Sequence, residues 1–217
     1  QKCGGRAFVL GTDALRNELE KESIQVVSTE EAEMSTPDFV VVGECTSRDT
    51  YNFEVVEFAV KLARRGARLI GTNEDVADRI GEEMIPGTGA LALPIQAASG
   101  AECYFLGKPN PFMVRNALDR LGASREASVF VGDRMNTDIK AGVEAGVDTI
   151  LVLSGVTSEA DILKFAYRPS VVLSGVGDIA AFLASKSGSP NSHAEMALED
   201  YECHSESPNR LCEEKET

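Results

Sequence analysis

The chain has 217 residues and a formal net charge of −14, with 43% hydrophobic and 26% charged residues. This length and composition are typical of a globular protein that buries a core. The acidic balance excludes a general binder of nucleic acid or of anionic membranes, because such proteins need a basic face. No apolar run approaches the ~20 residues of a membrane span. Five scattered cysteines without a Cys-x-x-Cys motif indicate reduced thiols, which favours a cytoplasmic location.

The first hundred residues alternate between predicted strands and helices. The segment 37–43 is nearly all apolar, as a strand buried on both faces should be. The segment 81–100 is rich in Gly, Pro and Ala, and its Pro86-Gly-Thr-Gly89 could cradle a phosphate. Gly-x-Gly alone is a weak signal, so we favour a plain turn there. The other predicted strands are 7–10, 24–27 and 68–73, and the predicted helices are 14–22 and 52–65.

The second half continues this alternation. Residues 103–153 read strand–helix–strand–helix–strand, which predicts three parallel strands in one sheet with right-handed crossovers. Asn110 is a predicted N-cap and Pro111 the first residue of a helix that ends before Gly122. The ordered body closes with a strand at 171–173 and a helix near 178–183.

The stretch 128–138 places Asp133 directly after a predicted strand and Asp138 where a helix begins. Ligands of open α/β sheets collect just outside the carboxyl ends of the strands. Taken alone, either aspartate could instead cap the following helix. Lys108 changes this balance, because it follows a nearby strand and is expected at the same sheet edge. A lysine beside a strand-end carboxylate suits a phosphate held against Mg²⁺, which takes carboxylate and phosphate oxygens.

The sequence disfavours two other kinds of site, a P-loop and a site built on histidine. Gly107-Lys108 is not the end of a P-loop, because Pro109 stands where Ser or Thr must bind magnesium. Both histidines, His193 and His204, fall in the polar stretch after residue 185. Histidine-based catalysis and zinc sites are therefore not expected in the folded body.

Two segments resemble the third and fourth motifs of the haloacid dehalogenase (HAD) superfamily: Gly107-Lys-Pro-Asn-Pro111 and Gly132-Asp-Arg-Met-Asn-Thr-Asp138. The match is closest to its NagD-like, p-nitrophenyl-phosphatase and phosphoglycolate/pyridoxal-phosphatase branch. Three further segments are similar to that branch, and the resemblance as a whole runs from about Ala7 to Leu183. They are Gly71-Thr-Asn73, Pro86-Gly-Thr-Gly-Ala90 and Leu151-Val-Leu-Ser-Gly-Val156.

The resemblance implies an α/β fold with two domains. Residues 1–101 would be an inserted α/β cap domain, and residues 102–184 would be the C-terminal part of a Rossmann-like HAD core. Residues 185–217 are acidic and rich in Ser, which predicts a disordered tail. The implied activity is Mg²⁺-dependent hydrolysis of a small phosphorylated metabolite, a phosphate monoester. The branch also implies a homodimer formed through the cap.

The resemblance assigns roles residue by residue. Lys108 would be a catalytic residue that holds the phosphoryl group and the nucleophile in place. Asp133 would ligate Mg²⁺, and Asp138 would support this metal site. Glu74 stands where the branch has proline, which leaves substrate choice open. The residues implied near the leaving group are Asn73, Gly87, Thr88 and Gly89.

The family's nucleophile comes from an Asp-x-Asp-Gly motif, and the 217 residues contain no Asp-x-Asp pair. Since Gln1 is also not Met, we expect an N-terminally truncated chain that begins in the cap and is inactive alone. The alternative is a nucleophile-free module that binds a phosphorylated ligand or a protein partner. A receiver-type phosphate acceptor is disfavoured, because it needs an acidic pair after its first strand.

Overall fold

We describe residues 4–45, 47–80 and 82–186 in a computed structural model of the chain. Within them, the residues up to Asp178 form one compact unit, and α8 (Ile179–Lys186) belongs to a second. The disordered tail that we expect at 185–217 lies outside the described residues, apart from its first two residues, which end α8. None of the helices in the described part of the chain is long and apolar enough to cross a membrane.

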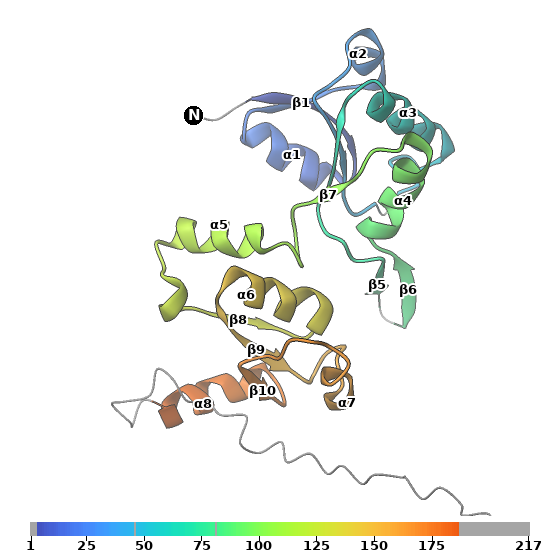
Figure 1. The fold of residues 1–217 in the computed structure, drawn as a ribbon. Coiled ribbons are helices and arrows are strands. Elements are labelled where there is room, and N and C mark those ends of the chain that lie inside the picture. Colours follow the sequence, from blue (N-terminus) through green and yellow to red (C-terminus); the bar gives the residue numbers. More distant parts are fainter. Residues whose placement is uncertain (1–3, 46, 81, 187–217) are drawn as a thin grey trace, which may run out of the picture. The chain divides into compact units, whose positions relative to one another are not determined.

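A five-stranded parallel sheet forms from the first half of the chain, in the order β2-β1-β3-β4-β7. Figure 1 labels two of its strands, β1 and β7, and the helices α1, α3 and α4 around it. Its central strands are apolar on both faces, so both faces need a covering of helices. The strands are β1 (Gly5–Leu10), β2 (Ile24–Val26), β3 (Phe39–Val42), β4 (Arg68–Gly71) and β7 (Tyr104–Phe105).

Alternate residues of β1 pack into two separate core clusters. Leu10 packs with Leu62 and Ile95 of two helices, α3 and α4. Val9 lies in the other cluster, with Leu15 of α1. Because successive strand residues point to opposite faces, α1 covers one face of the sheet while α3 and α4 cover the other. The helices are α1 (Asp13–Lys21), α2 (Thr29–Met34), α3 (Phe53–Arg64) and α4 (Thr88–Ser99).

A second parallel sheet has three strands in the order β10-β9-β8. Phe130 packs with Val114 of α5 in one cluster, and Leu151 packs with Ile139 and Ile162 in another. Its strands are β8 (Val129–Gly132), β9 (Asp148–Val152) and β10 (Val171–Leu173). The helices of this region are α5 (Pro111–Leu121), η1 (Arg125–Ala127), the π-helix η2 (Met135–Ile139), α6 (Lys140–Ala145), α7 (Glu159–Ile162) and η3 (Val176–Asp178).

The expected single sheet over residues 103–153 is wrong. β7 pairs with β4 of the five-stranded sheet rather than with β8. Gly71 of β4 allows this pairing, since a Cβ there would lie 2.3 Å from the ring of Phe105. β7 also lies past the boundary at 101/102 that we expect between the two domains, and that division stays a prediction.

The segment 81–100 is more regular than its composition indicates. β5 (Ala77–Ile80) pairs with β6 (Glu83–Pro86) as an antiparallel hairpin, and α4 follows over twelve residues. The helix contains Pro94, which predicts a helix break. It forms because Leu91, Ala92 and Ile95 are buried along one side, so packing outweighs local propensity.

Candidate functional site

Asp133 lies just outside the carboxyl end of β8, as its position in the sequence predicts. Its Oδ2 accepts a hydrogen bond of 2.9 Å from the backbone N–H of Val156, and its carbonyl accepts one of 3.1 Å from Thr157 N. A Cβ on Gly155 would lie 2.2 Å from this Oδ2, so only glycine fits there. The loop after β9 therefore packs against the carboxylate and holds its Oδ2 by a hydrogen bond. Among the described residues, Oδ1 of Asp133 has no hydrogen-bond partner.

Asp138 is buried in the π-helix η2, and both of its carboxylate oxygens are engaged. Oδ1 lies 2.6 Å from Nζ of Lys108. Oδ2 accepts hydrogen bonds from the backbone N–H groups of Asp133, at 3.1 Å, and Arg134, at 3.0 Å. A Cβ on Gly132 would lie 2.2 Å from Cβ of Asp138, so the strand end approaches this side chain closely. Asp138 thus positions both Lys108 and the loop that carries Asp133.

Lys108 reaches this site from the other sheet, between β7 and α5. A Cβ on Gly107 would lie 2.2 Å from the carbonyl oxygen of Thr72, so the start of this loop lies against the turn after β4. The Lys108–Pro109 peptide bond is cis. Asn110 caps α5 by accepting from Phe112 N at 3.0 Å, which confirms its predicted role.

The residues expected near the leaving group form one connected turn. Oδ1 of Asn73 accepts from Asp75 N at 3.2 Å, and Gly89 N donates to the carbonyl of Asp75 at 2.9 Å. The hydroxyls of Thr72 and Thr88 lie 3.3 Å apart. Gly87 is the N-cap residue of α4 and Thr88 its first residue, so the expected plain turn is in fact a helix start.

Arg134 joins this turn to the Asp133 loop. Its Nη1 lies 3.3 Å from Oδ1 of Asp75, and the two side chains are 25% and 14% exposed. The sequence analysis gave no role to Asp75 or Arg134, nor to Gly155 and Thr157. Arg134 and Gly155 do lie within segments that resemble the family, and the loop after β9 follows the strand next to β8, where a site is expected. Nothing in the sequence indicates that Arg134 pairs with Asp75.

The charges of the site favour a divalent cation. Three carboxylates (Asp75, Asp133, Asp138) and two cations (Lys108, Arg134) give a net charge of 2 − 3 = −1. A phosphate dianion would be repelled unless a cation is added.

The donor set fits Mg²⁺ as a partial site. The described residues hold no cluster of three or more Asp, Glu, His or Cys side chains that could bind a metal. Mg²⁺ is usually held by one or two carboxylates, with phosphate oxygens and waters filling the remaining positions. Oδ1 of Asp133 is available for this, while Asp138 is occupied by Lys108 and backbone N–H groups. The hydroxyl of Thr137 beside it is buried without a partner in the described chain, a polar atom that a ligand or water can satisfy.

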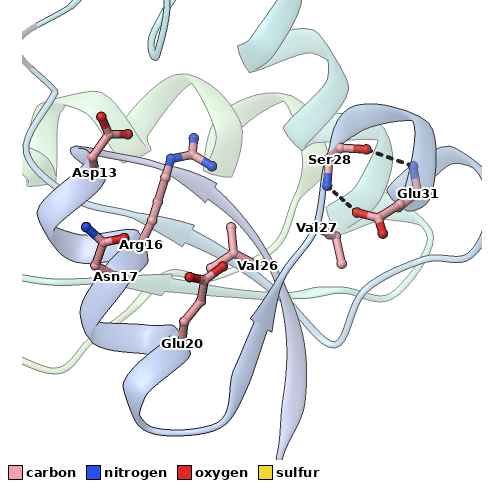
Figure 2. A pocket seen from close by; sticks show the side chains of 8 residues that line it. All are labelled: Asp13, Arg16, Asn17, Glu20, Val26, Val27, Ser28 and Glu31. Carbon is pink, nitrogen blue, oxygen red and sulfur yellow. Dashed lines mark hydrogen bonds between the residues drawn. The ribbon is translucent and has the colours of Figure 1, made fainter.

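A hollow of about 540 Å³ elsewhere includes none of these residues. It lies between α1, β2 and the start of α2 (Figure 2). Arg16 there donates to the carbonyl of Val9 at 2.5 Å, and Ser28 and Glu31 form a capping box. These polar groups support local structure, so we assign the hollow no function.

Comparison with known proteins decides the family. A profile described as HAD-hydrolase-like matches residues 105–179. Dihydroxyacetone phosphatase of Corynebacterium glutamicum is 42% identical over 176 residues, covering 81% of this chain and 61% of that protein. Ribonucleotide monophosphatase NagD of Escherichia coli is 40% identical, covering 81% and 66%. The solved p-nitrophenyl phosphatase of Archaeoglobus fulgidus is 30% identical with a TM-score of 0.73, covering 82% of this chain and 67% of that one.

The chain belongs to the HAD superfamily, in its NagD-like branch. The resemblance of its two motifs to this branch is thereby confirmed, as is the α/β fold. The chain spans 61% and 66% of the length of the two curated relatives above.

Proposed function

We propose that this chain carries the phosphate-holding and metal-holding half of a phosphatase site that hydrolyses small phosphate monoesters with Mg²⁺. The supporting observation is the 2.6 Å ion pair between Lys108 and Asp138, whose other oxygen holds the backbone of Asp133. This hydrogen-bond network connects the lysine to the loop that carries Asp133, whose Oδ1 is free among the described residues.

The proposed roles follow from what each group can do. Mg²⁺, when bound, would neutralise phosphate charge and polarise a phosphoryl oxygen. Asp133 would ligate it through Oδ1, because Oδ2 is taken by Val156 N. Lys108 would place a positive charge on the phosphoryl oxygens. Asp138 would position Lys108 and the backbone of Asp133 through its hydrogen bonds. It would support the metal site without being a metal ligand.

The leaving group would lie beside the turn that holds Asn73 and the start of α4, Gly87 to Gly89. Asn73 uses its Oδ1 within the turn, and its amide N–H groups have no partner among the described residues. Such donors suit hydroxyl groups. Two relatives are named dihydroxyacetone phosphatase and ribonucleotide monophosphatase, which supports a small, polar phosphorylated metabolite as the substrate here.

Covalent phosphoryl transfer also needs a carboxylate nucleophile. Residues 1–217 contain no Asp-x-Asp pair, so in this proposal the nucleophile is supplied from outside them. The proposal keeps residues 1–101 as a cap, residues 102–184 as part of the core, a homodimer through the cap, and a cytoplasmic location.

The test is phosphate release from a panel of small monoesters by the protein expressed from its complete reading frame. We expect turnover with Mg²⁺, none with a chelator, and a loss of at least a hundredfold in Lys108→Met or Asp133→Asn. Residues 1–217 alone should give none. Robust Mg²⁺-dependent turnover that survives Asp133→Asn would overturn the site assignment.

A second candidate is a binding module that lacks a nucleophile, and the missing Asp-x-Asp pair favours it. The same assay separates the two. If the complete reading frame binds phosphate with Mg²⁺ yet releases none from any ester, the binding module replaces the phosphatase.

A further inference from the structure

The ion pair between Arg134 and Asp75 is the feature that the proposed roles leave unused. It spans 59 positions of sequence and joins the turn after β4 to the loop after β8. At 25% and 14% exposed, the two side chains are far less accessible than the Arg65–Glu33 pair, at 41% and 57%. An ion pair shielded in this way is screened less by solvent, and its geometry is better defined.

The Asp75 end of the pair is held by its own turn. Its N–H is bonded to Asn73 Oδ1, and its carbonyl accepts from Gly89 N. The backbone of Asp75 is therefore bonded to Asn73 and to the first turn of α4.

The Arg134 end is held equally well. Its N–H donates to Oδ2 of Asp138, and its carbonyl accepts from the N–H groups of Asp138, at 3.0 Å, and Ile139, at 3.1 Å. Arg134 also follows Asp133 directly in the chain. Its guanidinium thus extends from backbone that is hydrogen-bonded to Asp138 and to the start of η2.

We propose that the Arg134–Asp75 ion pair is a positioning contact that fixes the Asn73 turn relative to the phosphate site and so determines which leaving groups bind. The inference rests on the proposed function, since it assigns a leaving-group side to that same site. Lys108 keeps its own partner, Asp138, when the pair is broken. The phosphate-holding part should then persist while the leaving-group part loses its position.

Two probes separate these parts: inorganic phosphate, and 3,4-dihydroxybutylphosphonate, an analogue of glycerol 3-phosphate whose P–C bond is not hydrolysed. Both are titrated by calorimetry at saturating Mg²⁺ into the complete protein. We expect Asp75→Asn to weaken the phosphonate by about tenfold while inorganic phosphate stays within about twofold. Arg134→Gln should weaken phosphonate binding by a similar factor. Asp75→Glu should retain part of the wild-type affinity for the phosphonate, because it keeps the negative charge.

The control is Glu33→Gln, which breaks the exposed pair with Arg65 and should leave both probes unchanged. Equal weakening of both probes in Asp75→Asn, or no change in either, overturns the inference. If the wild-type protein binds inorganic phosphate as expected, that outcome leaves the proposed function standing. If the wild-type protein binds neither probe, the proposed function fails and the inference fails with it.

Discussion

Asp133 and Asp138 are close in sequence, yet their carboxylates have different surroundings. Asp138 accepts from Lys108 and from two backbone N–H groups, whereas the carboxylate of Asp133 accepts from the described residues through Oδ2 alone. A buried carboxylate with three donors is costly to remove, because each donor then loses its partner. The two residues should therefore respond differently to substitution.

We expect Asp138→Ala to lower the free energy of unfolding by about 2–4 kcal/mol. Asp133→Asn should change it by less than about 1 kcal/mol, since the amide oxygen can still accept from Val156 N. Urea denaturation of both variants measures this difference. Comparable losses in the two would contradict the supporting role of Asp138.

Gly155 tests how tightly the loop after β9 holds Asp133. Alanine there would place Cβ 2.2 Å from Oδ2 of Asp133, so we expect Gly155→Ala to cost about 1–3 kcal/mol and to weaken Mg²⁺ binding. Gly177→Ala is the matched control, because a Cβ at Gly177 meets nothing within 4 Å. Thermal melting and a Mg²⁺ titration should separate the two variants. If Gly155→Ala leaves the melting temperature and the Mg²⁺ affinity unchanged, the loop after β9 does not hold Asp133 closely.

Cys103 and Cys45 are free thiols, and burial raises the pKa of Cys103 to about 12. Because the thiolate is the reactive form, a raised pKa lowers reactivity at neutral pH. At pH 8, iodoacetamide should label Cys103 roughly a thousandfold more slowly than an ordinary cysteine, and the rate should keep rising through pH 10. Peptide mass spectrometry measures the rate, with urea-unfolded protein as the control. A plateau near pH 9 would contradict the burial of this thiol.

At the scale of elements, stability comes from helices packed on the five-stranded sheet. Leu62 of α3 is fully buried, and Leu93 of α4 is 55% exposed. Leu62→Ala should therefore cost about 2–5 kcal/mol, through lost burial and the cavity left behind. Leu93→Ala should stay within about 0.5 kcal/mol. Urea denaturation compares the two, and equal effects would argue against α3 as a core helix.

The elements that could be predicted from the sequence are those with a clear local pattern. The run 37–43 is apolar and buried as β3, and Asn110 and Pro111 start α5 as expected. α4 was missed because its Gly and Pro residues disfavour a helix locally, whereas burial of Leu91 and Ile95 depends on the whole sheet. The predicted sheet for β7 was wrong for a related reason. Its pairing with β4 depends on the close approach of Phe105 to Gly71, two residues that are distant in the sequence.

The residues of the candidate site also divide into those that a local pattern indicates and those that it does not. Lys108, Asp133 and Asp138 follow strands within a recognisable motif, and the structure brings them together. The Asp75–Arg134 pair joins residues 59 positions apart, so no local pattern indicates that they pair. Contacts between distant loops depend on how the sheets are arranged, which periodicity does not report.

At the scale of the whole molecule, a net charge of −14 makes binding of any phosphate dianion unfavourable without local compensation. The site supplies two cations, and three carboxylates offset them. Phosphate binding should therefore require Mg²⁺.

The most direct measurement is a calorimetric titration of inorganic phosphate into the complete protein, with saturating Mg²⁺ and with a chelator. We predict binding only with Mg²⁺, and a loss of at least tenfold in affinity for Asp133→Asn and for Lys108→Met. Phosphate that binds equally well in the chelator, or equally well to Asp133→Asn, would contradict the assignment of this site.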